Sequence, residues 1–167
     1  MRKLFYLFSI LLLACGCTHI RNDKVFEQAK NMIRSNEAEC VVIQDGCIAA
    51  VERGRGVSPL LNLYDNNKKV LKSATVVDKV IGRAAAFIVI GAEASVVYGK
   101  IMSEDAMELL EKHGIECHYD LLVPKILNRK RDGLCPLEDS VKTCNDSDSA
   151  LKNMRKRIAE LRQGKMN

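Results

Sequence analysis

The stretch Glu39–Glu52 reads ECVVIQDGCIAAVE, two runs of β-branched and small apolar residues. Asp45-Gly46 stands between them, and this dipeptide between apolar runs is a strong signal for a β-hairpin. Alternation puts apolar side chains on both faces of the hairpin: Val41, Ile43, Ile48 and Ala50 on one, and Cys40, Val42, Cys47, Ala49 and Val51 on the other. A hairpin that is apolar on both faces must be covered on both, which predicts a sheet between two helical layers.

The register of this hairpin also bears on its cysteines. If Gln44 pairs with Cys47, then Cys40 and Cys47 share a face but stand roughly 13 Å apart along it. A disulfide requires Cα atoms within about 7 Å, so we expect no bond between these two and expect both in the core. The sequence leaves open any pairing among Cys117, Cys135 and Cys144.

Outside the hairpin, helical and strand patterns alternate. Helices are predicted over residues 24–34, from Ser58-Pro59, from Thr75 and Asp78 to about residue 86, from Ser103, over 123–127, over 135–144 and from 149. Further strands are predicted over 87–91, 95–99 and 115–119. The prediction is therefore an α/β fold, a three-layer α/β/α sandwich around one mixed sheet, with residues 18–145 as the domain and 146–167 as a basic amphipathic helix.

Length and composition set limits on function. A chain of 167 residues is long enough for one domain with a core. Aromatic residues make up 5% and Trp is absent, which argues against an aromatic platform for nucleic acid, so we expect no nucleic-acid partner. From Leu151 onward, basic residues far outnumber Glu160, the one acid. The tail helix is interpreted as docked by its apolar stripe, or as adhering to an anionic surface or partner helix.

The first residues have the pattern of an export signal. A basic start, Met1-Arg2-Lys3, precedes an apolar run too short to span a bilayer comfortably. The run ends in Leu12-Leu13-Ala14-Cys15-Gly16-Cys17, which resembles the lipobox of bacterial lipoproteins. This resemblance implies a signal peptide over 1–17, lipidation of Cys15 or Cys17, and an exported, membrane-anchored protein. The alternatives are an uncleaved anchor, or a mis-assigned start and a cytoplasmic protein.

Cys135 precedes Pro136 at a predicted helix start. Unpaired N–H groups and the helix dipole favour a thiolate at such a position, whereas the charge of nearby Glu138 opposes it. Cys135 is therefore either a structural cap or a nucleophile, with Glu138 or Asp78 as acid or base.

Arg53-Gly54-Arg55-Gly56, ahead of a helix start, is a candidate anion-binding turn, to which Lys79 and Arg83 could add charge. The alternative is a solvated turn. Cys117 and His118 are adjacent and point to opposite faces of a strand, so we expect no metal ligand and no cofactor.

Several motifs together resemble a known family. They are ERG at 52–54, PLL at 59–61, DKVIGRAAAF at 78–87, GIE and YD within 114–120, and the spaced pattern from Asn128 to Glu138. The resemblance is to the uncharacterised bacterial family of domain of unknown function 1893, which is placed in the cytidine deaminase-like superfamily. It covers about residues 25–141 and implies a deaminase-type sandwich.

The superfamily's zinc enzymes hold the metal at two helix starts with His or Cys ligands. The expected places are near Asp78 and near Ser103, where the sequence offers no His or Cys. The principal hypothesis is therefore a deaminase-like domain without metal that binds a small, anionic or nucleotide-like ligand. The alternatives are an enzyme using Cys135, zinc-dependent deamination, and an interaction module at the membrane.

Overall fold

The computed structural model describes residues 15–163, with side chains from residue 23 onward. In chain order the elements are α1 (Cys15–Arg34), β1 (Cys40–Gln44), β2 (Cys47–Glu52), α2 (Ser58–Asn67), η1 (Lys68–Leu71), β3 (Thr75–Ile81), α3 (Arg83–Gly91), β4 (Val96–Ser103), α4 (Glu104–Lys112), β5 (Glu116–Val123), α5 (Pro136–Val141) and α6 (Ser147–Gln163).

The predicted signal peptide lies largely outside the described residues. Cys15 and Cys17 fall in the first turn of α1, but their side chains are not among those described, so lipidation and export stay predictions. Within residues 15–163, no helix has the length and apolar character needed to cross a membrane.

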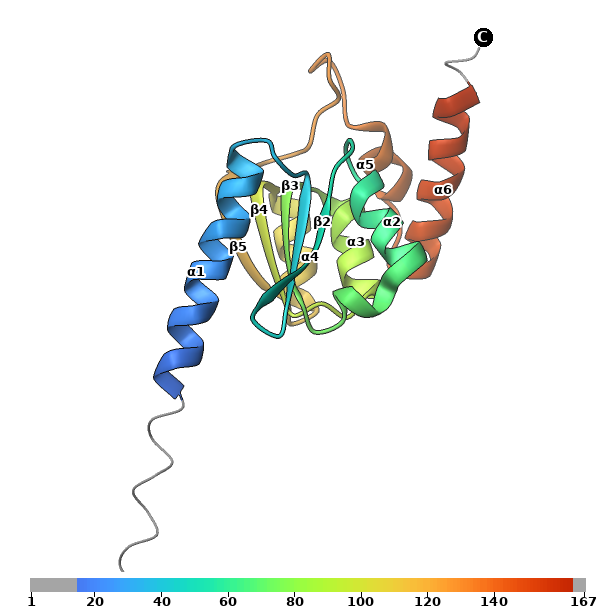
Figure 1. The fold of residues 1–167 in the computed structure, drawn as a ribbon. Coiled ribbons are helices and arrows are strands. Elements are labelled where there is room, and N and C mark those ends of the chain that lie inside the picture. Colours follow the sequence, from blue (N-terminus) through green and yellow to red (C-terminus); the bar gives the residue numbers. More distant parts are fainter. Residues whose placement is uncertain (1–14, 164–167) are drawn as a thin grey trace, which may run out of the picture.

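The strands form one mixed sheet in the order β2-β1-β3-β4-β5. β1 runs antiparallel to β2 and β3, whereas β3, β4 and β5 are parallel. α1 packs on one face, and α2, α3 and α4 cover the other, with α5 and α6 packed against α3 (Figure 1). The predicted three-layer sandwich around one mixed sheet is confirmed.

The β1–β2 hairpin forms as predicted, with one irregularity. Gln44 lies opposite Cys47, but a bulge between Val42 and Ile43 shifts the rest of the register. As a result Val51 packs with the α1 face and Ala50 with the other, the reverse of simple alternation. Cys40 is buried as expected, but Cys47 is exposed, so its assignment to the core was wrong. All the described cysteines, from Cys40 to Cys144, are free thiols.

The order of helix and strand over residues 75–91 is the reverse of the prediction. Residues 75–81 form β3, so Thr75 and Asp78 do not open a helix, and residues 87–91 belong to α3 rather than to a strand. The valine-rich run favours a strand that is buried on both faces, where no alternation marks it. The alanines at 84–86 favour the helix that follows.

The segment after β5 also differs from the prediction. β5 continues to Val123, and residues 123–127 are not helical. Pro124 explains the difference, because a proline disfavours helical backbone at the residue before it and removes one backbone donor.

The three parallel strands share a kink. Pairing between them is interrupted at Lys79, Lys100 and Asp120, which lie side by side. Tyr98 packs with the α1 face, yet Met102, four residues later, packs in the opposite core. An even separation keeps a side chain on the same face of a regular strand, so the strands turn their faces over at this point.

α1 ends at this kink. The Arg34 guanidinium donates to both carboxylate oxygens of Asp120, at 2.7 and 3.0 Å, and this pairing lowers the pKa of Asp120. Phe26 meets Tyr98 edge-on with ring centroids 5.9 Å apart. Burial and the Asp120 charge raise the pKa of Tyr98 to about 12, although the buried hydroxyl makes no hydrogen bond of normal geometry within the described residues.

The packing of α6 gives a first prediction. Met154 is fully buried, whereas Leu161 on the same stripe is 37% exposed. We expect Met154→Ala to lower the free energy of unfolding by about 2–5 kcal/mol, because it leaves a cavity in the core. Leu161→Ala is the matched control, with an expected loss below about 1 kcal/mol. Urea unfolding of both variants measures the difference; similar small losses would show that α6 is not part of the cooperative core.

Candidate functional site

Two helices start at the same edge of the sheet. α3 begins after β3 with Gly82 as its N-cap, and α4 begins after β4 with Ser103 as its N-cap. The Ser103 Oγ accepts a hydrogen bond from the Ala106 N–H at 3.3 Å, so the predicted cap is confirmed. In open α/β sheets, ligands bind outside the carboxyl ends of the strands, which is where these helix starts lie.

A cleft of about 250 Å³ opens between the two helix starts and α5. Ser103 and Asp105 line it from the start of α4, and Arg83 from the start of α3. The opposite wall carries Ile126 and Leu134 from the segment after β5, and its polar side chains are Lys125, Glu138 and Lys142.

Glu138 is the central buried group of the cleft. Its carboxylate accepts hydrogen bonds from the backbone N–H of Arg83 at 2.7 Å and of Ala84 at 3.1 Å. It therefore caps α3 from a different helix and places negative charge where the dipole of α3 favours it. Burial raises the pKa of Glu138 and the Asp105 charge raises it further, while the two N–H bonds act in the opposite direction.

Gly82 makes this cap possible. A Cβ atom at position 82 would lie 2.5 Å from Glu138 Oε1, closer than real Cβ contacts allow. The backbone of Gly82 is extended, so any residue could adopt its conformation. The position therefore requires glycine because of the space that the carboxylate occupies.

The cationic side chains of the cleft differ in the contacts that they make. Arg83 donates to the carbonyls of Val141 and Cys144 at 3.4 and 2.9 Å, which fixes it against the end of α5. Lys142 pairs with Asp139 at 2.8 Å on the exposed surface. Lys125 makes no ion pair with any residue in the described part of the chain.

The two helix starts do not fit a zinc ion. The start of α3 offers Gly82, Arg83 and Ala84, and its N–H groups are taken by the Glu138 carboxylate. The start of α4 offers a serine and two acids. Within residues 23–163, no group of three or more His, Cys, Asp and Glu side chains is placed to hold a metal ion.

Asp78 lies inside the sheet rather than at a helix start. It is 5% exposed, stands opposite Cys40 across the β1–β3 pairing, and accepts a hydrogen bond from the Val80 N–H at 3.0 Å. Burial raises the pKa of Asp78 to about 7, against the effect of this bond. Burial also raises the pKa of the Cys40 thiol. Asp78 does not line the cleft.

The other predicted site residues lie apart from the cleft. Cys135 is the N-cap of α5, as predicted, but its thiol makes no hydrogen bond to Asp78, Glu138 or another described side chain. Lys79 pairs with Glu39 at 3.1 Å, Arg53 donates to the Glu37 carbonyl, and Arg55 is exposed. Of the residues that the sequence singled out for a site, the structure brings Glu138 and Arg83 into the lining of the cleft.

Sequence reasoning missed three charged lining residues: Asp105, Lys125 and Lys142. Reading residues 75–81 as a strand would have marked Gly82-Arg83 as a helix start. The two lysines carry no local signal, because tertiary packing alone brings them to the cleft.

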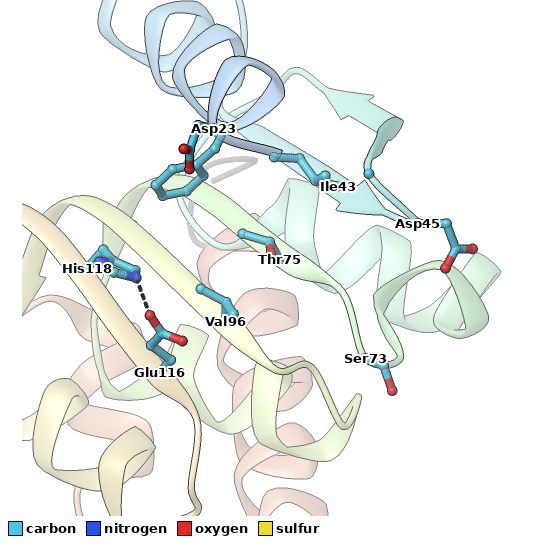
Figure 2. Close-up of a pocket in the computed structure, with 10 residues that line it drawn as sticks. Asp23, Ile43, Asp45, Ser73, Thr75, Val96, Glu116 and His118 are labelled. Carbon is cyan, nitrogen blue, oxygen red and sulfur yellow. Dashed lines mark hydrogen bonds and ion pairs between the residues drawn. The ribbon is translucent and has the colours of Figure 1, made fainter. Parts of the chain in front are cut away.

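A second pocket, of about 410 Å³, lies at the opposite end of the parallel strands (Figure 2). Thr75, Val96 and Glu116, the first residues of β3, β4 and β5, line it. His118 contacts Glu116 at 2.8 Å, whereas Asp45 lies at the far rim and points away from this pair (Figure 2). Its charged groups do not converge on one point, so the smaller cleft is the stronger candidate.

Comparison with known proteins agrees with the motifs. A family model described as domain of unknown function (DUF1893) matches residues 28–158. The crystal structure of a DUF1893 family protein from Thermotoga maritima has a TM-score of 0.69 and 20% identity, with 82% of this chain and 90% of that chain covered. It shows the same fold.

Two further solved structures are less similar. Acinetobacter baumannii RibD has a TM-score of 0.42 at 14% identity, and the match covers 60% of this chain and 35% of that one. A Thermotoga maritima protein named diaminohydroxyphosphoribosylaminopyrimidine deaminase/5-amino-6-(5-phosphoribosylamino)uracil reductase has a TM-score of 0.44 at 14% identity, with coverages of 74% and 41%. The chain thus spans less than half of each. A search of curated proteins found no match.

The contact between Gly82 and Glu138 predicts that substitutions at these two positions change the free energy of unfolding in a non-additive way. Gly82→Ala should lower the free energy of unfolding by about 2–4 kcal/mol, because the new Cβ displaces the carboxylate and leaves two N–H groups unpaired. Glu138→Ala should have a similar effect. In the double variant, Gly82→Ala should add less than about 1 kcal/mol, because the clash is gone. Urea unfolding measures all three variants; additive losses would contradict the proposed clash.

Asp78 predicts how stability depends on pH. Its carboxyl has a pKa of about 7 in the folded protein and roughly 3.9 in the unfolded chain. Between these values the folded state binds the extra proton, so the free energy of unfolding falls as pH rises from about 4 to about 7. Asp78→Asn should flatten this slope, whereas Asp148→Asn, at an exposed position, should leave it unchanged. Urea unfolding across this pH range gives the slope of the free energy of unfolding for each variant. If Asp78→Asn leaves this slope unchanged, the pH dependence comes from other groups.

Proposed function

The chain belongs to the DUF1893 family, and from this premise we propose that it binds a small anionic ligand without a metal ion, in the cleft at the starts of α3 and α4. The observation that carries the proposal is the distribution of charge in the cleft. Glu138 satisfies the start of α3 internally, while Lys125 and Lys142 face the cleft beside the start of α4.

The geometry supports an anionic group at a defined place. Ser103 takes one first-turn N–H of α4, and the helix dipole favours negative charge at this start. Lys125 and Lys142 supply positive charge on the facing wall, although Lys142 also pairs with Asp139. Asp105 lines the cleft from the start of α4 and would accept a hydrogen bond from a hydroxyl or amine on the same ligand.

The size of the cleft narrows the ligand class. Drug-sized ligands occupy pockets of about 300–1,000 Å³. A cleft of about 250 Å³ suits a smaller molecule, such as a phosphorylated sugar, better than a whole nucleotide. Glu138 serves as a fixed cap in this proposal and does not contact the ligand's anionic group, since like charges would repel.

A thermal-shift titration tests the proposal with ribose 5-phosphate, inorganic phosphate and AMP as ligands. Binding at 100 times Kd stabilises a protein by about 2.7 kcal/mol, which corresponds to a rise in Tm of roughly 5–10 °C for a chain of this size. We expect ribose 5-phosphate to give a saturable rise of this order. The double variant Lys125→Gln, Lys142→Gln should lose most of it.

Lys152→Gln is the matched control, because Lys152 is an exposed lysine on α6, outside the cleft. It should keep the full ligand-induced rise in Tm. The proposal fails if none of the three ligands gives a saturable shift, or if the double variant responds as strongly as the control.

A further inference from the structure

The kink in the parallel strands creates an apolar groove on the α1 side of the sheet. Ile81, Met102 and Leu122 pack into the large core, so their neighbours Val80, Ile101 and Leu121 point to the other face. α1 covers that face only as far as Asp120, which Arg34 contacts. Beyond this point the groove is bounded by the segment that follows β5.

The groove is open and aliphatic. Its volume is about 460 Å³, and its apolar lining includes Val80, Ile101, Leu121, Val123, Ile126 and Leu127. Leu121 is 53% exposed and Leu127 is 49% exposed, which places two of the most exposed large apolar side chains of the described chain in one concave surface. Contiguous exposed apolar surface of this kind marks interaction or ligand sites.

The polar groups of the groove have one sign of charge. Lys125 and Arg131 line it, and no acidic side chain among the described residues does so. Asn128 also lines it; its amide nitrogen donates to Asp132 at 2.7 Å, but its buried Oδ1 has no hydrogen-bond partner. Because this oxygen is buried beneath the surface, the charged groups that a bound molecule can reach in the groove are the exposed Lys125 and Arg131.

The segment after β5, which carries these groups, is preorganised by its own hydrogen bonds. It projects beyond the ends of the strands, in orange in Figure 1. Hydrogen bonds from the Asn128 N–H to the Gly133 carbonyl and from the Cys135 N–H to the Ile126 carbonyl close its two ends. Arg131 has a φ of 60°, a left-handed conformation that is strained for a residue with a side chain. Such strain persists where the surrounding structure imposes it.

We propose that this groove is a second binding site, for an aliphatic carboxylate. The aliphatic chain would cover Leu121 and Leu127, and the carboxylate would pair with Arg131 and Lys125. The aliphatic lining and the all-cationic rim each select one part of this molecule. The site is distinct from the cleft of the proposed function, although Lys125 and Ile126 form the wall between them.

Three ligands separate these contributions in calorimetric titrations of the full chain. N-octanoylglycine has the chain, the N–H and the carboxylate; decanoate lacks the N–H; N-octanoylglycinamide lacks the charge. We expect N-octanoylglycine and decanoate to bind with similar Kd values, and N-octanoylglycine to bind with a Kd about tenfold or more below that of the amide, because the carboxylate supplies the charge that Lys125 and Arg131 attract. Asn128→Ala should leave both comparisons unchanged, because its Oδ1 atom is buried beneath the groove.

Matched variants locate the binding. Leu121→Gln with Leu127→Gln, or Arg131→Gln, should raise the Kd for N-octanoylglycine about tenfold. Leu161→Gln and Arg129→Gln should leave it unchanged, because both lie outside the groove. Lys142→Gln should also leave it unchanged while weakening ribose 5-phosphate binding, so failure at one site can be told from failure at the other.

Two outcomes would overturn the proposal. One is equal binding of N-octanoylglycine to the wild type and to the groove variants. The other is weak binding of all three ligands together with sedimentation of the protein on phosphatidylglycerol vesicles that the groove variants abolish. That second result would make the groove a membrane contact instead of a small-molecule site.

Discussion

The carboxylate of Glu138 at the start of α3 is the interaction that organises one end of this molecule. A helix start buried without partners for its N–H groups is unfavourable, and here the partner comes from a residue 55 positions later than Arg83. The bond fixes α5 against α3, and the end of α5 in turn holds the Arg83 side chain through two carbonyls. The cleft exists because these pieces are locked around Gly82, which leaves the carboxylate its space.

The kink at Lys79, Lys100 and Asp120 has a comparable effect on the other face of the sheet. In regular strands, Val80, Ile101 and Leu121 would continue the alternation and enter the large core. Because the faces turn over, the core receives Ile81 and Met102 instead, and an aliphatic surface is left beyond the end of α1. The segment after β5 then separates two concave surfaces of different chemistry, one polar and one apolar, at the same edge of the sheet.

The sequence predicted the architecture because the evidence for it was local. A two-residue turn between runs that are apolar on both faces requires cover on both faces, and Ser103 and Pro136 marked true helix starts. The prediction for residues 75–91 was wrong because a fully buried strand shows no alternation, so Thr75 and Asp78 were interpreted as a helix start. The prediction of the site was less accurate still, since tertiary packing alone brings Lys125 and Lys142 to the cleft. Glu138 was singled out for its effect on Cys135, but its hydrogen-bond partners lie on a different helix.

The position of Glu138 also bears on which part of the cleft can receive a ligand. A helix start needs negative charge or acceptors, and a metal-bound thiolate, a bound anion or an internal carboxylate can each supply them. In this chain α3 has the internal carboxylate, so a second anion at that point would meet a like charge in a buried site. The start of α4 has the neutral hydroxyl of Ser103 as its cap and two acids, Glu104 and Asp105, in its first turn, and Lys125 and Lys142 face it. The two lysines offset these acids, so electrostatics directs an anionic group toward the lysines on the α4 side of the cleft and away from Glu138 at α3. The arrangement therefore supports binding beside one helix start without a metal ion held between two.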